Sequence, residues 1–469
     1  MLPKPRNLSI WPSVVPENKK SKMLITPNER AFLLFEGKEY TVRIMAVNGD
    51  DDYYAPKSDS IACVAKNGIL EFEYGFGPEQ EYLIHLVYED KVIHRFNVYA
   101  VGEDLYGLTP LKGDLHTHSY RSDGKRDPAA LAGHFREQGY DFFALTDHNR
   151  YYPGGEIDEV FSGVKCGITR VLGEEVHAPT ITVHTVHIGG KKSVCEQYLT
   201  DREGYEKEVA ALMEKVPESV PSIYHERYAK IMWVTEKIHE AGGIAIFPHP
   251  FWRPMDKTYN VNSELACILI KSGMFDAYEL VGGMPQPDLN CSLAMWNDMR
   301  AEGLKISVVG SSDVHGTENV ATFPHYFTVA FAKENTSDAI RDAVKASLCV
   351  AVESCGEEYK RQHRAYGSYR LVAYAQFLLK HYFPLRQRMC QGEGYAMRAY
   401  SMGETCAQLV ELEAEMTESF AKRFFGRMAP VLPTAEMIAF EDKWRAVHIE
   451  KGPVTKGSAV YSSVISRQI

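Results

Sequence analysis

The sequence predicts an α/β protein in which an all-β sandwich precedes a barrel and a helical region follows it. Apolar and polar side chains alternate from Met23 to about Val101, a pattern typical of half-buried strands. From Leu111 to about Glu353, short apolar strands alternate with helical segments. Such βα repeats favour a parallel sheet, most simply an α/β barrel. From about Gly356 the apolar residues recur at helical spacing. We therefore expect three domains, at residues 1–105, 106–355 and 356–469.

Composition narrows the partners that the chain can have. The net charge of −10 comes without a basic run that could follow a phosphate backbone. We therefore expect no stable nucleic-acid partner, and we leave a homo-oligomer open. No stretch of about 18 apolar residues and no apolar leader segment occurs, so we expect neither a membrane span nor secretion. Nine scattered cysteines without a C-x-x-C pair predict reduced thiols in a cytoplasmic protein.

The first and last segments predict packing modules without chemistry of their own. Period-two alternation is clearest in residues 40–46 and 82–88, between turn-forming Gly, Pro, Asn and Asp. No cluster of His, Asp and Glu occurs there. Near the other end we expect helices over residues 369–378 and 409–424, each with an apolar face for docking.

The middle segment supplies the elements of the barrel. Asp127 and Pro128 predict the N-cap and first turn of a helix that stops at Gly139. Strands are expected at residues 141–146, 171–172, 181–188, 244–247, 277–281, 305–309, 327–331 and 348–352. A polar insertion with a charged helical stretch fills residues 189–224. We interpret it either as a lid over the barrel mouth or as a decorated surface loop.

One stretch, from Gly113 to Gly124, suggests what the barrel is for. His116 and His118 are two residues apart on an extended segment, so their side chains lie on the same face. Two neutral imidazoles converging on one point are a starting pair for zinc, iron or manganese. Asp123, in the loop beyond, offers a hard oxygen ligand.

Ligand-competent residues follow at least six of the expected strands. Beyond the first strand they are His148 after Thr146-Asp147, Glu174 and Glu175, His187, His249, and the pair Asp313 and His315. The carboxyl ends of parallel barrel strands share one face, so these side chains should converge. Packing alone gives no reason to gather imidazoles and acids, because buried polar groups need partners. The sequence therefore predicts a metal centre, with Asp114 and Asp147 as neighbouring carboxylates that could orient its imidazoles.

The ordered motifs resemble those of the PHP (polymerase and histidinol phosphatase) metallohydrolases over about residues 111–353. They are Gly113-Asp-Leu-His-Thr-His-Ser, Ser122-Asp-Gly, Thr146-Asp-His-Asn, Gly173-Glu-Glu, His187-Ile-Gly, Pro248-His-Pro and Asp313-Val-His. The resemblance implies a distorted (βα)7 TIM-like barrel that holds two or three divalent ions, commonly manganese, iron or zinc. Many relatives have a histidine where this chain has Asp123.

The resemblance also assigns ligands. It implies one ion on His116, His118, Glu175 and Asp313. A second ion would be bridged by Glu175 and held by His187 and His249, and a third would be held by Asp123, His148 and His315. Glu174 competes with Glu175, and His184 with His187; spacing to the motif glycines favours Glu175 and His187.

We expect the chemistry of a metal-dependent phosphoesterase acting on a small phosphorylated molecule. Paired divalent ions lower the pKa of a shared water, so that hydroxide can attack, supported here by Asp313 and His315. Arg121, Arg150 and Arg253 adjoin the ligand motifs and are candidates for gripping phosphate oxygens. A carboxylic-ester or carbamate hydrolase on the same metals is the alternative, and an amidohydrolase barrel fits the motifs less well. A catalytically retired scaffold is the alternative from another class.

Overall fold

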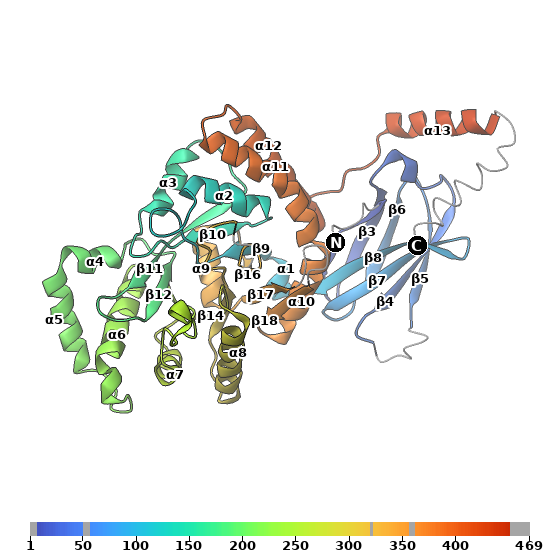
Figure 1. Ribbon diagram of the computed structural model, residues 1–469. Helices are drawn as coiled ribbons and strands as arrows, with labels where there is room; N and C mark the ends of the chain where they lie inside the picture. Colours follow the sequence, from blue (N-terminus) through green and yellow to red (C-terminus); the bar gives the residue numbers. More distant parts are fainter. Residues whose placement is uncertain (1–6, 50–56, 319–321, 356–361, 451–469) are drawn as a thin grey trace. The chain divides into compact units, whose positions relative to one another are not determined.

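The computed structural model describes residues 7–49, 57–318, 322–355 and 362–450, and it divides into two compact units. One unit comprises residues 2–107 together with 418–469, and the other comprises residues 108–417 (Figure 1). The helical residues that follow the barrel strands are thus divided between the two units. The three-domain division at residues 105 and 355 stays a prediction.

The N-terminal strands form two sheets that share one apolar core. A three-stranded antiparallel sheet has the order β1 (Leu8–Trp11), β3 (Lys20–Pro27) and β6 (Leu70–Gly75). A five-stranded sheet has the order β2 (Val14–Pro16), β8 (Lys91–Val101), β7 (Gln80–Tyr88), β4 (Glu39–Ala46) and β5 (Asp59–Val64). Ile25 of the first sheet and Val42 and Ile84 of the second are fully buried in one cluster. Alternation of this kind places every second side chain in the core.

The second unit is built on a ten-stranded sheet of order β15-β14-β13-β12-β11-β10-β9-β16-β17-β18. Its strands are β9 (Thr109–Asp114), β10 (Phe142–Leu145), β11 (Thr169–His177), β12 (His184–Ile188), β13 (Ile244–Phe247), β14 (Ala277–Val281), β15 (Ser307–Gly310), β16 (Tyr326–Ala332), β17 (Cys349–Cys355) and β18 (Gln362–Tyr366). The Thr328 hydroxyl donates to the carbonyl of Gly310 (2.9 Å) and lies 3.1 Å from its N–H. This contact joins β15 to β16, so the sheet is a nearly closed barrel.

Strand direction departs from the parallel barrel that the sequence predicts. β9, β10 and β11 are parallel to one another, as are β13, β14 and β15, but β12 is antiparallel to both of its neighbours. β16, β17 and β18 are antiparallel as well. The expectation that the chain beyond Gly356 is purely helical is wrong at β18. Its five residues are mostly polar and pair only along the edge of β17, so no apolar period marks them.

The chain between residues 128 and 424 also forms helices, of which α6, α7 and α8 lie side by side (Figure 1). The helices of this part of the chain are α2 (Pro128–Glu137), α3 (Pro153–Val160), α4 (Cys195–Thr200), α5 (Arg202–Met213), α6 (His225–Glu240), α7 (Ser263–Lys271), α8 (Gln286–Ala301), α9 (Ser337–Lys345), α10 (Tyr369–His381), α11 (Phe383–Ser401) and α12 (Ala407–Phe424). The predicted cap is confirmed, because the Asp127 carboxylate accepts from the N–H of Ala130. α11 packs on α2, where buried Arg136 donates to Glu393 at 2.6 Å. No helix in the described part of the chain has the length and apolar character to cross a membrane.

Candidate metal centre

Seven histidines and three carboxylates meet at one end of the barrel. They come from the ends of β9, β10, β11, β13 and β15 and from the start of β12. They are His116, His118, Asp123, His148, Glu175, His177, His184, His249, Asp313 and His315. Glu175 lies at the centre and is buried. Eight of the nine predicted ligands are therefore brought together, and His187 is the exception.

The first donor group surrounds Glu175 Oε2. His116 Nε2 and His118 Nε2 lie 3.2 and 3.4 Å from this oxygen. The same two nitrogens lie 3.3 and 3.0 Å from Asp313 Oδ1. Two ligands bound about 2.1 Å from one tetrahedral ion stand about 3.4 Å apart, so the four donors are spaced as if around a common cation.

Two further groups adjoin the first. At the other carboxylate oxygen, Glu175 Oε1 lies 2.7 Å from His184 Nδ1 and 3.2 Å from His249 Nε2. In the third group, Asp123 lies 3.3 Å from Nε2 of His148 and 3.3 Å from Nε2 of His315. His148 links the groups, because its Nδ1 is 2.8 Å from Glu175 Oε2.

Buried donors without hydrogen-bond partners show that these residues fit divalent cations. Although the distances are short, several atoms are not aligned as hydrogen bonds and have no partner: His116 Nε2, His118 Nδ1, His148 Nδ1, His184 Nδ1, His249 Nδ1 and Glu175 Oε2. Unsatisfied buried polar atoms are costly, and a shared cation would satisfy them together. Across residues 7–49, 57–318, 322–355 and 362–450, no lysine or arginine forms an ion pair with Glu175 or Asp313. The positive charge that these acids require must come from imidazolium or metal.

The electrostatics keep the central acids ionised. Burial alone would raise the pKa of Glu175 and of Asp313, but the neighbouring histidines outweigh burial and hold both well below their usual range. Burial also opposes protonation of His148, yet Asp123 and Glu175 raise its pKa to about 10. An ion that uses this imidazole must therefore displace a proton.

Glu279 is a functional residue that the sequence reasoning missed. This fully buried carboxylate on β14 accepts from His116 Nδ1 at 2.9 Å, which leaves Nε2 of that ring facing the donor group. A carboxylate behind a ligating histidine fixes the tautomer and raises the basicity of the ligand atom. The sequence feature that could have identified Glu279 is that it is a single acid inside the apolar run Ala277–Val281.

Asp114 and Asp147, proposed for that orienting role, hold the backbone instead. Asp114 accepts from the N–H groups of His116 and Ser312, each at 3.1 Å, and burial raises its pKa to about 7. Asp147 accepts from the N–H of Ser119 at 2.8 Å and from the hydroxyls of Ser119 and Ser122 at 2.7 and 2.6 Å. The two acids thus shape the loop that carries the first ligands.

The placement of His187 in the site is wrong, and strand direction explains why. β12 runs antiparallel to β11 with His184 opposite His177 and His187 opposite Glu174, so its start, and not its end, lies at the ligand face. Residues three apart on a strand also face opposite sides. His187 is consequently buried outside the cluster, with Nδ1 3.0 Å from Glu174 Oε1, while the rival residue His184 faces Glu175.

Two ligand candidates occupy strained backbone. His249 and Asp313 have φ angles of 25° and 49°, in the left-handed region that residues other than glycine rarely adopt. Such strain persists only where the surrounding structure holds it, and it concentrates at functional sites. Here it directs His249 and Asp313 toward two adjacent donor groups that share Glu175.

The three candidate arginines are all engaged by other groups. Arg121 pairs with Glu156 (2.7 and 2.9 Å), Arg150 donates to the Arg121 carbonyl, and Arg253 pairs with Asp288 at 3.0 Å. In the described residues their hydrogen bonds and ion pairs do not reach the histidine cluster. An aromatic side chain adjoins the cluster instead: Trp252, 38% exposed, has its ring centroid 5.7 Å from that of His249.

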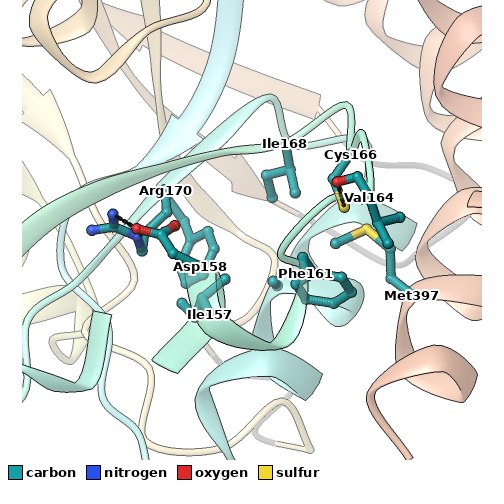
Figure 2. Close-up of a pocket in the computed structure, with 10 residues that line it drawn as sticks. Ile157, Asp158, Phe161, Val164, Cys166, Ile168, Arg170 and Met397 are labelled. Carbon is teal, nitrogen blue, oxygen red and sulfur yellow. Dashed lines mark hydrogen bonds and ion pairs between the residues drawn. The ribbon is translucent and has the colours of Figure 1, made fainter. Parts of the chain in front are cut away.

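A cavity at the other end of β11 is separate from this chemistry. It has a volume of about 220 Å³ and is lined mostly by apolar side chains, among them Ile157 of α3, Ile168 before β11 and Met397 of α11 (Figure 2). Arg170, near the start of β11, pairs there with Asp158. Glu175 lies five residues farther along the strand, about 17 Å away at the usual rise. The lining contains no histidine.

The geometry thus defines an α/β barrel protein with a cluster of metal-ligating groups, and comparisons place it near PHP-like proteins. No protein-family model matches the chain. A crystallised two-domain protein from Bacteroides vulgatus, described as containing a predicted PHP-like metal-dependent phosphoesterase, is 18% identical, with a TM-score of 0.35 over 56% of this chain and 76% of that one. A protein from Bifidobacterium adolescentis assigned as a metal-dependent phosphoesterase is also 18% identical, with a TM-score of 0.32 over 45% and 91%. The chain is thus similar to proteins of this description.

The chain is also similar to two further proteins. An amidohydrolase from Chromobacterium violaceum is 19% identical, with a TM-score of 0.30 over 44% of this chain and 87% of that one. The DNA polymerase/3'-5' exonuclease PolX of Bacillus subtilis is 26% identical over 223 residues, or 47% of this chain. The chain spans 37% of the length of that curated relative. The expected absence of a nucleic-acid partner stays a prediction.

Proposed function

We propose that the protein is a metal-dependent hydrolase of the PHP type, with a distorted (βα)7 barrel and two or three divalent ions. The observation that carries this proposal is the sharing of Glu175, whose two carboxylate oxygens each face imidazole nitrogens of a different donor group. Adjacent ligand groups with a common carboxylate are the arrangement used by two-metal hydrolases, whose ions stand about 3.5–4 Å apart.

The ligand assignment follows the geometry, with His184 in place of His187. One ion would use His116, His118, Glu175 and Asp313; the next would use Glu175, His184 and His249; the third would use Asp123, His148 and His315. Bound ions would lower the pKa of a water and neutralise charge on the group under attack. Glu279 would hold His116 in its ligating tautomer. Asp313 and His315, at the partly exposed side of the cluster, would contact the incoming substrate.

A phosphate ester of a small molecule is our first substrate class. Arg121 can turn to a phosphate, because its ion pair with Glu156 lies partly in solvent and such pairs are weak. Arg253 is held by Asp288, which is almost fully buried. The engagement of all three arginines, together with the apolar surface of Trp252, favours a carboxylic ester or carbamate as the second class.

Reconstitution of the protein with metal distinguishes the two substrate classes. Chelator-treated protein would be loaded separately with manganese, iron or zinc and assayed on matched panels of phosphate, carboxylic and carbamate esters. We expect hydrolysis that requires metal and is abolished in Asp313→Asn, whereas His239→Ala, on the surface away from the cluster, keeps it. Failure to bind any metal, or equal hydrolysis by Asp313→Asn, would contradict the proposal.

A further inference from the structure

We propose that His177 is an additional metal ligand, outside the nine positions that the PHP resemblance supplies. It completes a donor set of three imidazole nitrogens and one carboxylate oxygen at Glu175 Oε1. The inference rests on the proposed metal-dependent function and deepens it, because it indicates which kind of ion this position selects.

Three ring nitrogens surround one oxygen. From Glu175 Oε1 the distances are 2.7 Å to His184 Nδ1, 3.2 Å to His249 Nε2 and 3.6 Å to His177 Nε2. These values bracket the spacing of about 3.4 Å expected between ligands on one tetrahedral ion. The His177 distance is too long for a hydrogen bond, so direct pairing with Glu175 does not account for the position of the ring.

The sequence spacing and the strand register place the His177 ring next to Glu175 and His184. His177 follows Glu175 by two residues on β11, so both side chains lie on the same face. It stands directly opposite His184 on β12, and the two rings stack with centroids 3.7 Å apart and planes 20° apart. The ring also lies beside His148, at a centroid distance of 4.4 Å.

The backbone of His177 is fixed from both sides. Its N–H donates to Asn149 Oδ1 at 2.9 Å, and its carbonyl accepts from the Tyr198 hydroxyl at 3.1 Å. The ring is partly exposed, but its Nε2 is buried and has no hydrogen-bond partner. A nitrogen held in place, removed from water and left unpaired beside an ionised carboxylate is suited to receive a cation.

The composition of this donor set predicts its ion. Three imidazoles with one carboxylate form a nitrogen-rich site, which suits zinc or ferrous iron, whereas manganese and magnesium favour oxygen-rich sites. The group at His116 and His118 has two nitrogens and two oxygens by comparison, the oxygens being those of Glu175 and Asp313. We therefore expect the ion at His177 to be zinc or iron even when a neighbouring position accepts manganese.

Metal binding, measured apart from turnover, tests this assignment. Chelator-treated wild type, His177→Gln and His177→Ala would be titrated with zinc against a chromophoric chelator and with cobalt, whose d–d absorption reports coordination. We expect both variants to lose affinity for one ion by at least about tenfold and to show an altered cobalt spectrum. His239→Ala is the matched control and should behave as the wild type.

The outcomes separate this inference from the proposed function. If the wild type binds metal and both His177 variants keep its stoichiometry, affinities and cobalt spectrum, His177 is not a ligand although the metal centre stands. If the wild type binds no metal, the proposed function fails and this inference fails with it. X-ray absorption spectroscopy of the zinc-loaded His177 variant that stays soluble provides a second measurement. The mean number of imidazole ligands per zinc ion should be lower than in the wild type.

Discussion

Replacing His184 and His187 separately with alanine should produce opposite effects, because the structure places the two rings in different environments. His187 is fully buried and its Nδ1 lies 3.0 Å from Glu174 Oε1. Its loss removes a hydrogen bond to a buried acid and leaves a cavity. We expect the free energy of unfolding of the metal-free protein to fall by about 3 kcal/mol. Metal content should stay at the wild-type value, since no ligand is lost.

His184→Ala should behave in the reverse way. The His184 Nδ1 has no hydrogen-bond partner, so its removal should change the stability of the metal-free protein by less than about 1 kcal/mol. Its absence from the Glu175 Oε1 group should weaken one ion by more than about 100-fold, beyond what loss of an outer partner costs. Urea unfolding after chelation and elemental analysis after reconstitution measure the two effects. Metal loss in His187→Ala with unchanged stability, or full metal content in His184→Ala, would refute the placement of β12.

Three further predictions concern other parts of the unit. Glu279→Gln should reduce metal affinity about 10–100-fold while the fold is retained, measured by chelator competition; unchanged affinity would show that His116 needs no carboxylate behind it. Arg121→Ala should lower kcat/KM for phosphate esters about 10–100-fold and leave carboxylic esters within about twofold, and an equal effect on both would favour the second substrate class. Burial, with Arg398 and Arg126 nearby, lowers the pKa of His134 to about 4, below the unfolded value of about 6.5. The folded protein therefore binds this proton less readily than the unfolded protein does, so protonation favours unfolding. The contribution of neutral His134 to the free energy of unfolding is complete above about pH 6.5 and should fall by about 2 kcal/mol at pH 5. Urea unfolding at pH 7 and pH 5 should show a smaller acid loss in His134→Gln than in the wild type.

Most of the metal centre could be predicted from the sequence because its signals are local. The i, i+2 spacing of His116 and His118 fixes a common face, and the ends of parallel strands share one end of a barrel. Both rules need only the order of residues and the type of each element. The same is true of the helix that begins after Asp127.

The one misplaced ligand came from a rule applied to the wrong kind of strand. Strand-end convergence holds for parallel strands, but only residues 178–183 separate β11 from β12. A parallel crossover needs a dozen or more residues, so this short connection already required an antiparallel hairpin. Read in that way, the start of β12 belongs to the site and His184 becomes the ligand.

Glu279 could not be assigned from the sequence in the same manner. An acid within a buried apolar strand signals a paired carboxylate, yet its partner His116 lies 163 residues away in the chain. The pairing depends on which strands of the barrel face each other across its interior. That information exists only in the three-dimensional arrangement.

The insertion at residues 189–224 is tied to the metal centre through the neighbours of two ligands. Glu174, next to Glu175, accepts from the Ser193 hydroxyl at 2.7 Å and from the N–H of Val194 at 2.5 Å. Asn149, next to His148, accepts from the hydroxyl of Tyr198 on α4 at 2.6 Å. Movement of the whole insertion as a rigid lid would break all three hydrogen bonds and remove two donors from the buried Glu174, at a cost of several kcal/mol. The first part of the insertion is therefore a fixed wall of the site, and any opening motion must lie beyond α4.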